Sequence, residues 1–126
     1  MNRDDLRKRT KDFALRIIRM VASLPRSTVS NVIGKQVLRS GTSIGANYRE
    51  ALRASSRKHF ASTVAIVLRE ADETLYWLDL LADANIVKPG KLSLLRKEAD
   101  ELIAIFAATL KKTKSQIPNP KSLLSC

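Results

Sequence analysis

Residues that interrupt helices or build thiol and metal sites are scarce in this sequence. Its 126 residues include four glycines, four prolines, one histidine and one cysteine. So few breaking residues favour helices over many short strands, and Val and Ile do not alternate with polar residues as they do in strands. The single cysteine, Cys126, excludes an intrachain disulfide, which fits a reducing compartment.

Long hydrophobic runs are also missing. The longest apolar stretch near the C-terminus, residues 102–108, is far shorter than the roughly 20 residues that a membrane span needs. The first residues are charged and contain no apolar signal core. We therefore expect a cytoplasmic protein that does not contact membranes. Its length, with 44% apolar and 28% charged residues, is typical of one globular domain.

Acidic residues are outnumbered almost two to one by basic ones. The chain has 23 lysine and arginine residues against 12 aspartate and glutamate residues, which gives a net charge of +11 and a pI near 10.3. Such an excess attracts polyanions, of which nucleic acid is the default partner. A charge that serves solubility alone is the alternative interpretation.

Apolar side chains recur at helical spacing in four segments, at about residues 4–24, 28–54, 56–84 and 92–114. Short connections predict that consecutive helices pack antiparallel. We therefore expect an all-α, up-down-up-down four-helix bundle over residues 1–114, followed by a tail over 115–126. The predicted core stripes are Leu6, Phe13, Ile17, Met20, Val21 and Leu24; Val29, Ile33, Val37, Ile44 and Tyr48; Phe60, Val64, Val67, Ala71, Leu75 and Leu78; and Leu95, Ala99, Leu102, Phe106 and Leu110.

The second predicted helix carries three glycines and a polar stripe. Gly34, Gly41 and Gly45 each cost up to about 1 kcal/mol relative to alanine inside a helix. A sequence tolerates this cost where a neighbouring backbone comes close or where a polar network is built. A solvated face that borders the core is an equally good interpretation of the stripe. Its members, at steps of four and three residues, are Gln36, Ser40, Ser43, Asn47 and Glu50.

The third predicted helix is apolar over an unusually wide arc of about 200°, where a monomer needs a stripe only somewhat wider than about 100°. Ile66, Trp77 and Leu81 form a second apolar face, and Thr63 and Glu70 lie on the same flank. We expect this surplus apolar surface to contact a partner helix, most economically from another copy of the chain.

An antiparallel bundle brings four segments to one pole: the start of the first and third helices and the end of the second and fourth. The basic residues of these segments exceed what favourable contact with a helix dipole requires. We predict that this basic pole binds nucleic-acid phosphates. Its candidate residues are Arg3, Arg7, Lys8, Arg9, Lys11, Arg49, Arg53, Arg57, Lys58, Lys111, Lys112 and Lys114, with Lys121 in the tail.

Catalytic patterns are weak in this sequence. His59 is the only histidine, and no glycine-rich phosphate loop follows a strand. Two Glu-x-x-Glu pairs on facing helices are the exception, because such pairs hold Mg²⁺ in all-helical nucleotide pyrophosphatases. These residues are Glu70, Glu73, Glu98 and Glu101. Since Glu73 points about 60° away from Glu70 on a helix, we predict no enzyme, no metal and no cofactor.

Two segments resemble a known family. QVLRSGTSIGANYREA at residues 36–51 and EADETLYWL at residues 70–78 are similar to the four-helix bundle proteins encoded in intervening sequences of bacterial large-subunit ribosomal RNA genes. The resemblance covers about residues 5–115. The accessory variability determinant proteins of diversity-generating retroelements are similar in fold but match less closely.

The resemblance implies a homopentamer of bundles arranged as a barrel or cone that binds nucleic acid, in a family with no established enzymatic activity. It also implies that Ser43, Asn47, Glu50, Glu70 and Trp77 belong to the family pattern. Because the family name records where the genes were found, it does not establish a ribosomal role for the protein.

Taken together, these patterns predict a non-enzymatic, homo-oligomeric bundle that binds RNA or DNA through its basic surface with little sequence specificity. Most of the six aromatic side chains fall on predicted core or interface stripes, which leaves few for stacking on bases. A scaffold or accessory subunit for an acidic or nucleic-acid-processing partner is the second hypothesis. A Mg²⁺-dependent nucleotide pyrophosphatase is the third.

Overall fold

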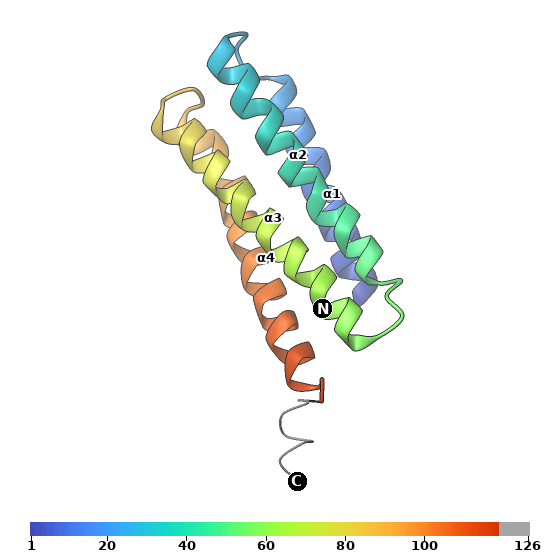
Figure 1. Cartoon of the computed structure of the whole chain (residues 1–126). Coiled ribbons are helices and arrows are strands. Elements are labelled where there is room, and N and C mark those ends of the chain that lie inside the picture. The colour runs from blue at the N-terminus through green and yellow to red at the C-terminus, as the bar shows by residue number, and fades with distance from the viewer. Residues whose placement is uncertain (119–126) are drawn as a thin grey trace.

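The computed structural model describes residues 1–118, which form four long helices. They are α1 (Arg3–Ala22), α2 (Thr28–Ala51), α3 (Arg57–Asp83) and α4 (Pro89–Ser115). Consecutive helices run antiparallel in one bundle, and the described residues contain no strand (Figure 1). The predicted all-α, up-down-up-down fold is confirmed. Most of the predicted tail, with Lys121 and Cys126, lies outside the described residues.

Side chains at the helix starts satisfy backbone N–H groups that no helical carbonyl reaches. Asn2 accepts from the backbone N–H of Asp5 at 2.8 Å and forms a capping box with that residue. At the start of α2, Oγ of Ser27 accepts from the backbone N–H of Ser30, and at the start of α3, Oγ of Ser56 accepts from that of His59, each at 3.0 Å. Such caps typically contribute about 1 kcal/mol each. α4 begins at Pro89, three residues earlier than predicted, because proline is favoured in the first turn of a helix.

The core is built from all four helices. Phe13 and Ile17 of α1, Ile44 of α2, Leu78 of α3 and Phe106 of α4 are fully shielded from solvent. The rings of Tyr48 and Phe106 meet edge to face, with centroids 5.3 Å apart, so side chains of α2 and α4 touch in the core although the two helices are not neighbours.

One core prediction is wrong. Val29 is 57% exposed, whereas its neighbour Ser30 is 3% exposed. The buried positions of α2 follow steps of four and three residues from Ser30 through Gly34 and onward, and Val29 lies about 100° away from that line. The packing direction of the rest of α2 therefore decides which residue of the first turn is buried, although Ser30 is more polar than Val29.

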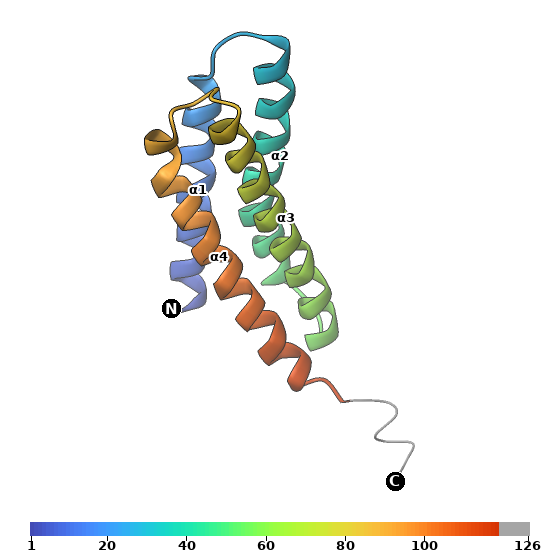
Figure 2. The same cartoon turned by 90° about the vertical axis from the view of Figure 1, so that its left-hand side faces the viewer.

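The helices do not contact one another equally. α3 packs along both α2 and α4, α2 also packs along α1, and the contact between α1 and α4 is small. α3 and α4 have 27 residues each, whereas α1 has 20. In Figure 2 the C-terminal part of α4 diverges from α1 and extends beyond it. The bundle consequently consists of two hairpins, α1–α2 and α3–α4, which contact each other mainly through α2 and α3. α3 therefore has a long neighbour on each side.

Glycines of α2 bring α1 unusually close, as their position inside a helix predicts. A Cβ atom on Gly41 would lie 2.9 Å from Cγ1 of Ile17, and one on Gly45 would lie 3.3 Å from Oγ1 and 3.5 Å from the backbone carbon of Thr10. A Cβ on Gly34 would meet the end of the Leu24 side chain at 3.1 Å. The helix-propensity cost of these glycines is thus offset by tight packing of α1 on α2.

Candidate nucleic-acid interface

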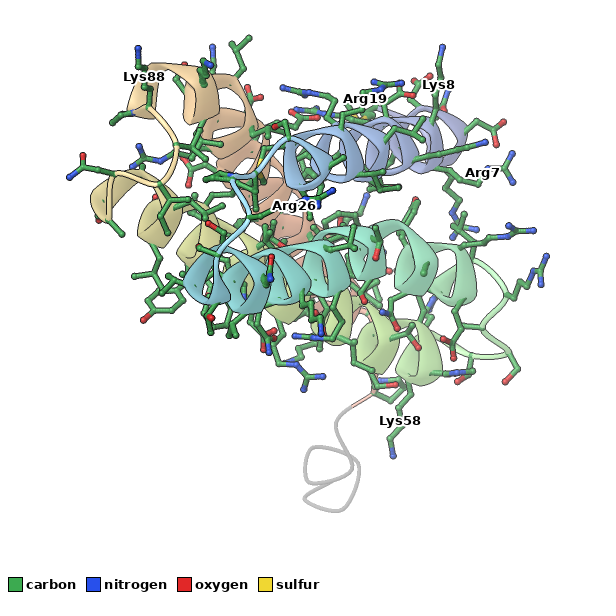
Figure 3. All side chains as sticks on the ribbon, turned by 90° about the horizontal axis from the view of Figure 1, so that it is seen from above. Arg7, Lys8, Arg19, Arg26, Lys58 and Lys88 are labelled. Carbon is green, nitrogen blue, oxygen red and sulfur yellow. The ribbon has the colours of Figure 1, made fainter. Side chains whose placement is uncertain are left out.

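The predicted basic-pole residues within 1–118 are exposed with one exception, Arg9. They surround one end of the bundle and do not gather on one face. In Figure 3, Arg7 and Lys8 project from α1, while Lys58 projects from α3 on another side of the bundle. The pole therefore consists of several basic patches, and each needs to be judged by its own geometry.

Arg9 is engaged by α4. Its Nε donates to Oε2 of Glu98 at 2.7 Å, and its Nη2 donates to Oε1 of Glu98 at 2.6 Å and to Oε2 of Glu101 at 3.1 Å. The hydrogen bond from Arg9 lowers the pKa of Glu98 below its usual value. Since this paired guanidinium is only 24% exposed, we correct the sequence-based set and leave Arg9 out of the phosphate-binding residues.

The second Glu-x-x-Glu pair meets a different arginine, one that sequence reasoning did not single out. Arg39 of α2 donates to Glu70 at 3.2 Å and to Glu73 at 2.9 Å. These carboxylates lie between α2 and α3, while Glu98 and Glu101 lie against α1. The two acidic pairs thus bind different arginines, Arg9 of α1 and Arg39 of α2. No cluster in residues 1–118 brings together three potential metal ligands.

A groove between α1 and α2 is lined by four basic side chains. Arg7, Lys8 and Lys11 come from α1 and Arg49 comes from α2, and Asp4 is the one acidic residue in its lining. Asp4 and Arg7 form a weak, exposed ion pair at 3.6 Å. Within the described chain, the other three cations make no ion pair. The other lining residues, which we call the floor, have short side chains or none; they are Ala14, Thr42, Gly45 and Ala46.

A second hollow lies between the start of α1, the end of α4 and the connection from α2 to α3. It contains Arg3 and Arg57, with Ser55, Ser56 and Gln116 among its polar residues. The guanidinium of Arg3 lies 5.6 Å above the ring centroid of Phe60, a cation–π distance. Arg3 is thereby held against α3, so this hollow has fewer free cations than the α1–α2 groove.

His59, the one histidine, lies outside the linings of both hollows. His59 is exposed, and its backbone N–H is taken up in the cap at Ser56. Among the helices described, none has the length and apolarity needed to span a membrane.

Comparison with known proteins gives the chain a family. The model of the 23S rRNA-intervening sequence protein family matches residues 4–108. The chain belongs to this family. A solved structure of a protein of unknown function from the S23 ribosomal protein family of Bacteroides thetaiotaomicron is 35% identical and superimposes with a TM-score of 0.81. The match covers 88% of this chain and 99% of that one, while no curated protein matches.

The residues that carried the resemblance to the 23S rRNA-intervening sequence family lie along α2 and α3. Ser40 is fully buried, and its hydroxyl is 3.0 Å from that of Thr74 on α3. The amide of Asn47 donates to the carbonyl of Ser43 within α2. Glu50 is exposed and Gln36 is half-buried. Within the polar stripe, Ser40 thus packs between helices and Glu50 faces solvent. Each of the two interpretations from the sequence therefore holds for some members of the stripe.

The wide apolar arc of α3 has a largely intramolecular explanation. Leu81 is fully buried in the core, and Thr63 and Glu70 are 4% and 6% exposed. Because α3 packs on both α2 and α4, it needs a wider apolar arc than a helix with one neighbour. Ile66 and Trp77 are half-buried, and within residues 1–118 the buried indole N–H of Trp77 has no hydrogen-bond acceptor.

Large apolar side chains remain exposed on α2 and α3, and they are not the residues that the sequence placed at an interface. Tyr76 is 57% exposed, and its ring meets that of Trp77 edge to face at 5.3 Å. Val29 and Val32 on α2 are each 57% exposed as well. Exposure of large apolar side chains on adjacent helices is the feature of this structure that favours association with another chain.

Proposed function

We propose that this chain is a non-enzymatic, cytoplasmic nucleic-acid-binding protein that holds RNA or DNA by its phosphates. The observation that carries the proposal is the contrast between two sets of basic residues. Arg9, Arg39 and Arg96 are paired with carboxylates of neighbouring helices. The predicted pole residues in the described chain are, apart from Arg9, exposed, and most make no ion pair. Free cations on a surface with few acidic neighbours favour polyanions.

The test is binding of mixed-sequence RNA and DNA as a function of salt. We expect affinity to fall steeply as salt rises, because each phosphate contact releases bound counterions and contributes about 0.7–0.9 to the slope of log K against log salt. Replacing Arg7, Lys8 and Lys11 together by Glu should reduce affinity sharply and flatten that slope. These positions are exposed, so the fold should survive.

A matched triple change on the opposite end separates local contact from global charge. Arg26, Lys88 and Lys91 to Glu changes the net charge identically, and Figure 3 shows Arg26 and Lys88 at the end of the bundle away from Arg7 and Lys8. This variant should lose much less affinity than the first, because it affects binding only through long-range attraction. Equal losses in both variants would mean that net charge alone matters, and no binding by the unmodified chain would favour the scaffold hypothesis.

We also propose that the protein works as a homo-oligomer, with the pentamer as the state that the family resemblance implies. The exposed Tyr76, with Val29 and Val32 on the adjacent helix, supports this proposal. Light scattering at micromolar concentration should give a mass several times the 14.0 kDa of one chain. Tyr76→Ser should lower that mass while leaving the helical signal in circular dichroism unchanged. A clean monomer of the unmodified chain would refute self-association.

A further inference from the structure

The α1–α2 groove combines free cations with a floor that a ligand can approach. Arg7 and Lys11 are one turn apart on the same side of α1, about 6 Å along its axis, and Arg49 faces them from α2. Lys8 adds a fourth cation, and Asp4 is the single opposing charge. The balance of formal charge in the lining is therefore three positive units on two walls that face one another.

The floor of this groove decides what shape of polyanion fits. Its residues are short, and Gly45 also brings α2 against Thr10 of α1, so the two helices are in direct contact beneath the groove. Helices in contact have axes about 8–10 Å apart, which leaves a shallow furrow between them. A single sugar–phosphate backbone lies in such a furrow along its length. A duplex is wider than such a furrow, so it would touch only the rims.

The lining contains no aromatic side chain. Base stacking is the usual source of affinity in single-strand sites and of their modest base preferences, so its absence leaves phosphate contact as the main source of affinity here. A strand held in this way presents its bases to solvent. RNA and DNA of any sequence satisfy the same set of contacts.

We infer that the α1–α2 groove is a track for one nucleic-acid strand, which it holds by the sugar–phosphate backbone with the bases facing outward. This inference rests on the proposed nucleic-acid binding and goes beyond it, since it assigns the site to four residues of the basic pole and the ligand to single strands. The α3 and α4 residues of the pole then contribute mainly by long-range attraction.

A substitution that fills the groove without changing charge tests this assignment. Ala46→Leu places a larger side chain on the floor, at an exposed position where leucine is a good helix former. Ala104→Leu, on an exposed position of α4 outside the groove, is its matched control. We expect Ala46→Leu to weaken binding of a labelled 20-nucleotide oligouridine by about tenfold and Ala104→Leu to leave it within about twofold.

A neutralised groove and a duplex competitor complete the experiment. Arg7, Lys11 and Arg49 to Gln should lower the salt slope by about 2, at roughly 0.7 per lost single-strand contact. An unlabelled duplex of equal length should compete less well than the single strand. Equal binding by the Ala46→Leu and Ala104→Leu variants would overturn the groove but leave nucleic-acid binding intact. A duplex that competes as well as the single strand would overturn the choice of ligand, and absence of all binding would overturn the proposed function.

Discussion

Gly41 offers the sharpest test of how α1 and α2 pack. Gly41→Ala adds one methyl group whose carbon would lie 2.9 Å from Cγ1, 3.0 Å from Cγ2 and 3.3 Å from Cβ of Ile17. Three contacts to one branched side chain cannot all be relieved by rotating its end. Ile17 is fully buried, so it has no open space into which it can move. The two helices must therefore separate, or Ile17 must leave its preferred rotamer.

Two opposing effects set the size of the change. Alanine is favoured over glycine inside a helix by about 1 kcal/mol. Overpacking a well-filled core costs typically about 1–3 kcal/mol, and the contact distances at Gly41 put this site toward the upper part of that range. We expect Gly41→Ala to reduce the free energy of unfolding by about 1–2 kcal/mol. For a chain of this length the melting temperature should fall by about 4 °C per kcal/mol.

Thermal unfolding followed by circular dichroism measures this effect, and Gly90 supplies the control. A Cβ on Gly90 would meet nothing within 4 Å, so Gly90→Ala should raise stability by about 0.5 kcal/mol by restricting the unfolded chain. Opposite signs at Gly41 and Gly90 are the expected result. If Gly41→Ala stabilises the protein as Gly90→Ala does, then α1 and α2 do not approach as closely as described.

A double-mutant cycle identifies the clashing partner. Ile17→Ala removes both γ carbons that the new methyl group would meet, at the cost of a cavity. In that background Gly41→Ala should stabilise the protein, because its two shortest contacts are gone and its helix propensity remains. The coupling between the two changes should therefore reach about 2 kcal/mol, well above the 0.3–0.5 kcal/mol or so within which independent sites add. Additive effects would mean that Ile17 is not the residue that excludes a side chain at position 41.

Three further predictions concern stability. Arg9 lowers the pKa of Glu98, so the ionised carboxylate stabilises the folded state and Glu98→Gln should lose that stability at neutral pH. In urea titrations the loss should be constant above about pH 6. It should vanish as pH falls below the usual glutamate pKa of about 4.3 and through the lowered value. Thr74→Val should cost about 1 kcal/mol in urea unfolding, since it removes the buried hydrogen bond with Ser40. Phe106→Ala should cost about 3–5 kcal/mol by the same assay, because the ring is fully buried.

Periodicity predicts which face of each helix is apolar, and here it predicted the bundle and most of its core. It fails where the outcome depends on the register between helices. Arg39 finds its carboxylates 31 and 34 residues away, and no local spacing connects them. Arg9 has the same local context as its basic neighbours on α1, and only the approach of α4 separates it from them. The direction of the first turn of α2, which exposes Val29, is likewise decided by the tertiary contacts of later turns.

Intramolecular pairing also concentrates the positive charge on the rest of the surface, while the net charge of the molecule stays at +11. Arg9, Arg39 and Arg96 take five of the twelve carboxylates into ion pairs. The rest of the chain is left with 20 basic and seven acidic residues, an excess of 13 compared with the overall net charge of +11. The three paired clusters keep a net charge of −2, so helix packing decides where the charge lies and leaves its sum unchanged. The attraction of this surface for polyanions follows partly from the fold and cannot be read from the net charge alone.

Packing and binding meet at Gly45. This residue lines the α1–α2 groove, and it also brings α2 against Thr10 of α1. A side chain at position 45 would both raise the floor of the groove and push against α1. The effects of such a substitution on binding and on stability could therefore not be separated. Ala46, the next residue of the floor, is exposed, and a larger side chain there fills the groove with no demand on the core. Loss of binding in Ala46→Leu at unchanged melting temperature would therefore assign the effect to the groove itself.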